Sequence, residues 1–482
     1  MAVTVTPVAA PRSASEPPAL EISLTEHLAR ALVAVDSLTM DETTIGHAKR
    51  FILDWLGSAM AGAPTPPGKM LTAEAADRGP GPVQVLGLAE GRDAATAALV
   101  NGGLSHIVEM DDLDRRSVVH PGTVVIPAAL AAAQQANRSG RDFLIAVVVG
   151  YDAAIRVGEA VGRSHYASWQ NTATCGAFGS AAAAGWLMGL DAQAMAWAFG
   201  NAGSIAGGLW QFNHDGAMTK HLHAGQAAAN GVMSARLAAR GFSGAREILE
   251  GPQGFFAAMS TDASPERVIA GLAGGGGPPA EWKIAGVSMK PHASCRHTHP
   301  AVDAALALRS AIGPAVREAS SIRVATYAVA LAVTDEPQPR NVYQAKFSLQ
   351  YTVAQALNHG QVGLHDFSND RLDDPITRRL MTRTVLRTDP VIDSRYPSAW
   401  LARVEVVLQD GSTHQVEVDA PKGDPENPLS DDELTAKYRD LVRGTAYEAS
   451  TGEMLAAIAA LEDRPTMDGF FPVISTIMES NT

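Results

Sequence analysis

Apolar residues recur at intervals of three and four from Thr25 to about Gly271, and this periodicity constrains the fold more than any other feature of the sequence. The segments "FILDWLGSAMAG" and "TVVIPAALAAAQQA" are examples. Alanine and glycine abound while aromatic residues make up only 6% of the chain, a composition that favours closely packed helices. We therefore expect a mainly α-helical protein, and its 482 residues predict at least two domains.

A glycine-rich stretch, "GLAGGGGPPAEW" at 271–282, is typical of a linker. Beyond it, "WKIAGVSMK", "SIRVATYAVALAV" and "ARVEVVLQDGSTHQVEVDA" predict strands, the last a hairpin about "QDGS". Helix resumes at "SDDELTAKYRDLVRGT", which opens with a serine cap. Either these last helices rejoin the first helical domain, which makes the α+β segment an insertion, or they form a separate unit. The first residues, 1–20, predict a disordered tail.

Charge and composition exclude several classes of partner. The formal net charge is −13 and no run of lysine or arginine could follow a phosphate backbone, so nucleic acid is not expected as a partner. The longest apolar run, "FLIAVVVG", is too short to span a membrane. Two cysteines and no secretion signal favour a cytoplasmic protein. An anionic ligand would require a local cationic pocket.

The stretch "MKPHASCRHTHPAVDAALAL" gathers three histidines, a cysteine and two cationic residues. His297 and His299 precede a proline, where an extended chain would turn their side chains apart, and no zinc motif accompanies them, so we expect no metal. Pro300 suits the first turn of a helix. We therefore expect His299 at the helix N-terminus, where a neutral imidazole can act as a general base and free amides can bind a carboxylate.

A second histidine, His120, also precedes a proline and a small-residue helix. Two such helix entries suggest two imidazoles that face one pocket. The acidic run before His120 can orient an imidazole or shift its pKa; its carboxylates are Glu109, Asp111, Asp112 and Asp114.

Two further stretches offer groups that can bind an anion. Lys220 lies among three histidines in "NHDGAMTKHLH" and can bind a substrate carboxylate. In "SWQNTATCGAFGSAAAAGW", Gln170 and Cys175 lie just before a glycine-rich helix start with free backbone amides. Cys175 is either a nucleophile or a buried packing residue.

Several of these motifs, in this order, resemble the MmgE/PrpD family, which includes 2-methylcitrate dehydratases, cis-aconitate decarboxylases and iminodisuccinate epimerases. They include "HIVEMDD", "HPGTVVIPAALAAAQ", "CGAFGSAAAAG", "GAMTKHLHAGQAAANG" and "CRHTHPAVDAA". The resemblance implies one large all-helical domain from both chain ends, 21–275 and 427–482, and a smaller inserted α+β lid domain, 282–426. It also implies a homodimer with its active site in a cleft, without a metal or an organic cofactor.

The same resemblance implies site residues. The family's active-site histidines fall on His120 and His299 and its lysine on Lys220. Its acidic position falls on Glu109, Asp111 or Asp112, of which Asp112 is our predicted catalytic carboxylate. Substrate binding is predicted for five residues: Glu109, Gln170, Lys290, Arg296 and Tyr351.

The expected function is a cofactor-independent lyase of the dehydratase type. It would act on a di- or tricarboxylate by moving a proton at the carbon next to a carboxylate, where cationic side chains stabilise the developing negative charge. The alternatives are an epimerase of an iminodisuccinate-like compound, a cis-aconitate-type decarboxylase and a non-catalytic carboxylate-binding protein. Animal decarboxylases resemble this chain but carry histidine where Gln170 stands, and glutamine cannot shuttle a proton.

Overall fold

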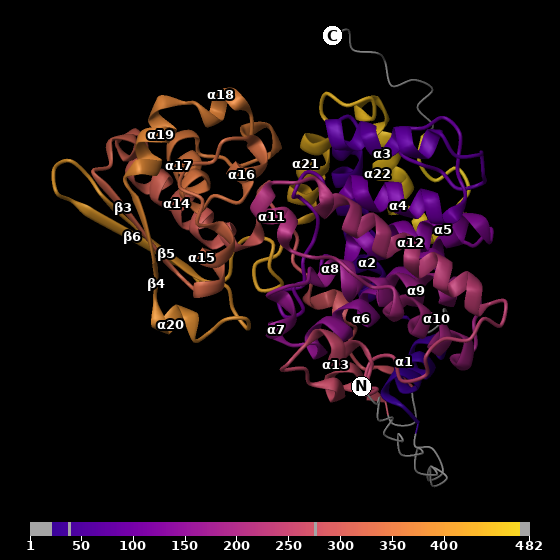
Figure 1. Ribbon diagram of the computed structural model, residues 1–482. Coiled ribbons are helices and arrows are strands. Elements are labelled where there is room, and N and C mark those ends of the chain that lie inside the picture. Colours follow the sequence, from indigo (N-terminus) through magenta and orange to yellow (C-terminus); the bar gives the residue numbers. More distant parts are fainter. Residues whose placement is uncertain (1–21, 37–39, 274–276, 473–482) are drawn as a thin grey trace, which may run out of the picture.

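The computed structural model describes residues 22–36, 40–273 and 277–472 and is mainly helical with a small α+β part, which confirms the predicted fold class (Figure 1). The predicted tail, 1–20, lies outside the described residues. Figure 1 shows a large helical body and, beside it, a smaller unit that carries a sheet. No helix in the described part of the chain combines the length and apolarity needed to cross a bilayer.

Small residues allow the helices of the body to pack closely. A methyl group added at Gly225 of α12 would collide with the carbonyl oxygen of Leu99 in α4, so these two helices can approach only because glycine stands there. The close approach brings the start of α12 beside the end of α4. The main helices of the body are α1 (Leu24–Val33), α2 (Glu42–Gly62), α3 (Pro66–Ala76), α4 (Ala94–Ser105), α5 (Pro121–Gln135), α6 (Gly140–Ala160), α9 (Gly176–Leu187), α10 (Ala192–Ser204) and α12 (Thr219–Ala238).

The last helices of the chain return to the helical body. Helix α21 (Asp431–Val442) begins with the predicted capping box at Ser430, and α22 (Thr451–Ala459) follows. Both pack against α2, where Lys437 forms a buried ion pair with Asp54. Residues from the two ends of the chain therefore share one core, while the domain boundaries given above stay a prediction.

The smaller unit is built on a four-stranded sheet of order β4 (Thr384–Thr388), β3 (Ser321–Thr326), β5 (Ala402–Val407) and β6 (Thr413–Val418). Strands β3 and β4 are parallel and the other neighbours antiparallel, and β5 and β6 form the predicted hairpin. Helix α14 (His299–Ile312) packs on β5 and β6 and against α17 (Leu349–His359). Alternate residues of β5 are buried, as expected for a strand with one covered face.

The strand predicted over "WKIAGVSMK" is wrong. Lys283–Gly286 form a 3-10 turn, and only Ser288 pairs, in a single antiparallel bridge with Leu113. The apolar alternation arises because Ile284, Val287 and Met289 are each buried in the core. The bridge matters for the site, since it ties the acidic stretch before α5 to the start of the smaller unit.

Candidate active site

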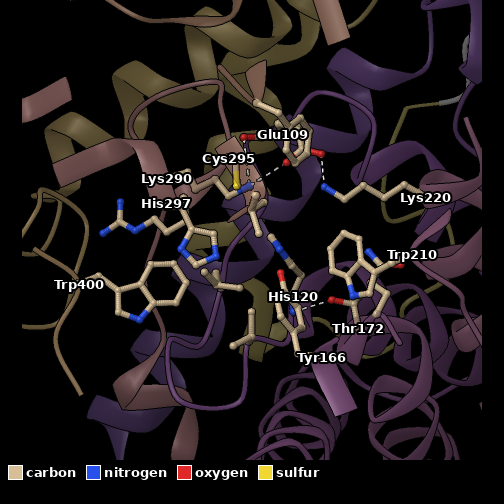
Figure 2. A pocket seen from close by; sticks show the side chains of 16 residues that line it. Glu109, His120, Tyr166, Thr172, Trp210, Lys220, Lys290, Cys295, His297 and Trp400 are labelled. Carbon is tan, nitrogen blue, oxygen red and sulfur yellow. Dashed lines mark hydrogen bonds and ion pairs between the residues drawn. The ribbon is translucent and has the colours of Figure 1, made fainter. Parts of the chain in front are cut away.

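A narrow, partly open pocket lies where the helical body meets the smaller unit (Figure 2). Three short segments supply most of its polar groups: the loop between α4 and α5, the start of α12, and the stretch before α14. Its lining residues are Glu109, Leu113, Val118, His120, Tyr166, Gln170, Thr172, Trp210, Lys220, Lys290, Cys295, Arg296, His297, Val333, Phe347 and Trp400.

The segment 106–120, which we term the acidic loop, joins α4 to α5 and carries Glu109. This residue has φ +61°, a left-handed conformation that costs a non-glycine residue about 1–3 kcal/mol. Its carboxylate forms ion pairs with Lys220 and, at 3.3 Å, with Lys290. The three side chains are almost fully buried, and Figure 2 shows Glu109 between the two lysines.

The charges around Glu109 leave the pocket positive. Burial opposes ionisation, but Lys220 and Lys290 hold the pKa of Glu109 well below its ordinary value. A third ammonium group belongs to Lys346, whose pKa burial lowers to about 8. Among the residues that line the pocket, two lysines, Lys220 and Lys290, face one carboxylate, that of Glu109, so one positive charge is in excess. Asp111 and Lys346 are not lining residues, and together they add one charge of each sign nearby. This is the local cationic site that an anionic ligand requires in an acidic protein.

His120 caps the N-terminus of α5, with Pro121 in the first turn as predicted. Its Nδ1 lies 2.7 Å from Oδ2 of Asp111, which is an ion-pair distance. The angles at this contact, however, are not those of a hydrogen bond. Burial lowers the pKa of His120 to about 4, with Asp111 opposing the shift. The imidazole is therefore neutral at pH 7. Within the described residues, no hydrogen bond involves its Nε2.

Asp111 also contacts a second histidine, His106. Nδ1 of the buried His106 lies 2.7 Å from the same Oδ2, and Nε2 of His106 lies 3.2 Å from the amide nitrogen of Gln170. The amide oxygen of Gln170 in turn lies 2.8 Å from Nδ1 of His223. His106 and His120 are thereby joined through one carboxylate, at the base of the pocket.

The donor atoms of His106, Asp111 and His120 all lie within 4.8 Å of one another, a spacing that could also hold a metal ion. Both imidazoles, however, contact one carboxylate oxygen, and the ammonium of Lys290 lies 3.9 Å from the other. Hydrogen-bonding protons fit such an arrangement better than a cation beside an ammonium group. Metal analysis of the purified chain tests this assignment.

His297 supplies the second imidazole of the pocket. Its ring stacks on Trp400 with centroids 4.2 Å apart, and its Nδ1 lies 2.7 Å from the hydroxyl of Tyr327. Burial, together with the charges of His120 and Lys290, lowers the pKa of His297 to about 3. His297 is therefore a second neutral imidazole, on a different segment of the pocket wall from His120.

The structure brings six of the nine predicted site residues to the pocket: Glu109, His120, Gln170, Lys220, Lys290 and Arg296. The guanidinium of Arg296 is largely engaged by the protein, since one nitrogen donates to the carbonyl oxygen of Lys422 and another pairs with the buried Asp424. We therefore expect Arg296 to hold the pocket-lining segment in place and not to bind the substrate directly.

Asp112, His299 and Tyr351 are not among the lining residues. Asp112 accepts hydrogen bonds from the backbone N–H of Gly122 and the hydroxyl of Tyr151, so it caps α5 from the core side. Burial raises the pKa of Asp112 well above its ordinary value. Its neighbour Asp111, not Asp112, contacts the pocket histidine.

His299 is the first residue of α14, as the following proline predicts, but it does not line the pocket. It contacts the guanidinium of Arg296 at 2.8 Å and the carbonyl oxygen of Ser294 at 3.2 Å. Tyr351 donates its hydroxyl proton to the carbonyl oxygen of Asp366, inside the smaller unit. Both side chains therefore lie behind the pocket wall.

Sequence reasoning missed several residues of the site. His106 lies in the motif "HIVEMDD", three residues before Glu109, but only the carboxylates of this motif were predicted as site residues. Tyr166, Trp210, Phe347 and Trp400 reach the pocket from distant segments with no local motif. Burial raises the pKa of the lining Cys295 to about 11 and that of Cys175 to about 12, so both thiols stay protonated at neutral pH, as in packing residues.

The comparison with known families agrees with these motifs. A model described as the MmgE/PrpD N-terminal domain matches residues 26–268, and one described as the MmgE/PrpD C-terminal domain matches residues 292–463. The chain belongs to the MmgE/PrpD family. The two matches leave a gap that contains the glycine-rich linker. Both matched MmgE/PrpD parts contribute residues to the pocket, among them His120 from the first and His297 from the second.

Similar MmgE/PrpD proteins cover almost the whole chain. The cis-aconitate decarboxylase-like protein oryM of Aspergillus oryzae is 28% identical over 89% of this chain and 92% of its own length. The cis-aconitate decarboxylase of Aspergillus terreus is 27% identical over 89% and 91%. The human cis-aconitate decarboxylase is 28% identical over 86% and 87%. Each of these relatives carries an enzyme's name or an enzyme-like one.

Proposed function

We propose that this MmgE/PrpD protein is a lyase that acts on a di- or tricarboxylate by proton transfer at the carbon next to a carboxylate, using only its own side chains. One observation carries the proposal: two neutral imidazoles, His120 and His297, line a pocket with excess positive charge. A neutral imidazole can take a proton from carbon, and nearby cations stabilise the charge left on the adjacent carboxylate.

Lys220 and Lys290 are the groups we assign to the substrate carboxylate. Their shared contact with Glu109 fixes both ammonium groups in a buried site, where they need not reorganise as charge develops. One such group typically contributes 10²–10³-fold in rate. Because Glu109 neutralises only part of their charge, the two ammonium groups can still attract a carboxylate of the substrate.

His120 is our candidate for the base, since it alone of the two pocket imidazoles contacts a carboxylate. Asp111 stabilises the imidazolium that forms when Nε2 takes the proton. In a dehydration the same imidazolium can give that proton to the departing hydroxyl group, so that water leaves and a carbon–carbon double bond forms. His297, hydrogen-bonded to Tyr327, would bind the opposite side of the substrate.

Decarboxylation of a polycarboxylate is the second candidate, because the relatives named above include cis-aconitate decarboxylases. Loss of carbon dioxide leaves the electron pair on a carbon next to a carboxylate, and a protonated His120 could then deliver a proton to it. The same cationic groups would serve both reactions. Gln170 lacks a titratable proton, which favours dehydration over a route that needs a further proton donor at that position.

Proton NMR in deuterium oxide tests the proposal with a panel of 2-methylcitrate, citrate, cis-aconitate, iminodisuccinate and tartrate. A new vinylic signal without loss of carbon dioxide would identify a dehydratase, and release of carbon dioxide a decarboxylase. Replacement of the α-proton by deuterium alone would identify an epimerase. If a compound binds but shows no exchange and no product, the chain is a carboxylate-binding protein and the proposal is wrong.

A further inference from the structure

Gln170 lies between two histidines at the base of the pocket. It precedes the short helix α8 (Asn171–Thr174), and its side chain is almost fully buried. The amide NH₂ lies 3.2 Å from Nε2 of His106, and the amide oxygen lies 2.8 Å from Nδ1 of His223. An amide has a fixed polarity, since its nitrogen only donates and its oxygen only accepts. Its orientation therefore determines where each histidine carries its proton.

Asp111 decides which way the amide must point. Nδ1 of His106 lies 2.7 Å from Oδ2 of Asp111, and an ionised carboxylate can only accept. A neutral His106 thus carries its proton on Nδ1, and its Nε2 presents a lone pair that needs a donor. The NH₂ group of Gln170 is that donor. The opposite amide orientation would direct the carbonyl oxygen at the lone pair.

The remaining hydrogen bond agrees with the same orientation. With its NH₂ group on His106, Gln170 turns its oxygen to Nδ1 of His223, which can donate. Every donor in the series from His223 to Asp111 then meets an acceptor. Oδ2 of Asp111, at the end of the series, is the atom that also contacts Nδ1 of His120.

We propose that Gln170 is a positioning residue that holds the proton of His106 on Nδ1. Through His106 it keeps Asp111 oriented toward His120, so that Nε2 of His120 stays free to exchange a proton with the substrate. This role rests on the function proposed above. A titratable side chain at position 170 would let the proton of His106 move to Nε2, whereas the amide does not.

The variant Gln170→Glu tests this role, because it keeps the shape of the side chain but offers two acceptor oxygens in place of a donor and an acceptor. Nε2 of His106 would then have to carry a proton. We expect kcat for the compound converted in the panel to fall on the order of 10²-fold, with a smaller change in KM and an unchanged melting temperature. The control His223→Gln keeps the NH₂ group on His106 and should retain kcat within about threefold.

Long-range proton–nitrogen NMR of protein labelled with ¹⁵N-histidine reads the tautomer directly and needs no substrate. The signals of His106 are assigned by their loss in His106→Gln. We expect His106 to carry its proton on Nδ1 in the wild-type protein and in His223→Gln. In Gln170→Glu we expect it to gain a proton on Nε2. A wild-type His106 protonated on Nε2, or a Gln170→Glu variant with unchanged kcat, would overturn the proposal. If the tautomer is as expected but no compound reacts, the proposed function fails and the positioning role in the unliganded protein stands.

Discussion

Nδ1 of His120 lies 2.7 Å from Oδ2 of Asp111. Burial opposes ionisation, but His106, His120 and Lys290 hold the pKa of this carboxyl group well below its ordinary value. Because this contact lacks the angles of a hydrogen bond, the ionised carboxylate acts on His120 through its charge. That charge favours the proton on the nearer ring nitrogen, Nδ1, and leaves a lone pair on Nε2. In the function proposed above, Nε2 is the atom that takes the proton from the substrate.

Asp111→Asn should lower kcat by about 10²–10⁴-fold, because the amide stabilises neither the required tautomer nor the imidazolium of His120. Steady-state kinetics with the converted compound measures the effect, and circular dichroism checks the fold. Retention of more than a tenth of the wild-type kcat would exclude Asp111 from this role.

Asp112→Asn is the matched comparison, since Asp112 is the next residue and is equally buried. Its carboxyl group caps α5 and binds Tyr151, so the expected loss is about 1 kcal/mol of unfolding free energy, with kcat within a few fold of wild type. Urea unfolding and kinetics on the same preparation distinguish the two effects. A loss of kcat as large as in Asp111→Asn would show that Asp112 is the catalytic carboxylate, as predicted from the sequence.

His297→Gln and His299→Gln separate the two histidines of "CRHTHP". Only His297 lines the pocket, so its variant should lose on the order of 10² in kcat/KM while its melting temperature changes little. His299→Gln disturbs the contact with Arg296 and should mainly lower the melting temperature. The reverse pattern, with kcat/KM lost only in His299→Gln, would support the assignment made from the family resemblance.

Acid should destabilise the folded protein at pH values above the ordinary pKa range of carboxyl groups. Burial lowers the pKa of His165 to about 4, and its two ring nitrogens contact the carbonyl oxygen of Met259 and the hydroxyl of Thr174. Above about pH 6.5 the imidazole is neutral in both states, so it adds no pH dependence. Between pH 6.5 and 4 the unfolded chain takes up a proton that the folded chain does not, and stability falls.

Between pH 7 and pH 5, His165 alone should account for a loss of about 2 kcal/mol. Urea unfolding at a series of pH values measures this slope. His165→Gln, whose side chain does not titrate, should show a correspondingly flatter dependence. An equal slope in the variant and in the wild type would mean that His165 is protonated in the folded protein.

The prolines after His120 and His299 predicted both helix starts, because proline fits the first turn whatever surrounds it. They could not show which histidine faces the pocket. Arg296–Thr298 form a 3-10 turn where an extended chain was expected, and this turn directs His297 to the pocket. The local backbone conformation at Arg296–Thr298 thus decides that His297, and not His299, lines the pocket.

The choice between Asp111 and Asp112 was beyond the sequence for the same reason. Both carboxylates are buried, and only tertiary packing shows that Asp111 contacts His120 while Asp112 binds Tyr151. Trp400 and Tyr166 enter the pocket through contacts between distant segments, which no local pattern encodes. The homodimer and the cytoplasmic location expected from the sequence stay predictions; light scattering of the purified chain tests the first.

The most direct test of the account is a rate: either the incorporation of solvent deuterium at the α-carbon of the converted polycarboxylate or the formation of its product. This rate is compared in the wild-type protein, His120→Gln and His214→Gln. His214 is exposed and lies outside the pocket, so it controls for the substitution itself. The account predicts a wild-type rate in His214→Gln and a loss of at least about 10²-fold in His120→Gln. Equal rates in all three proteins would contradict the assignment of His120 as the base.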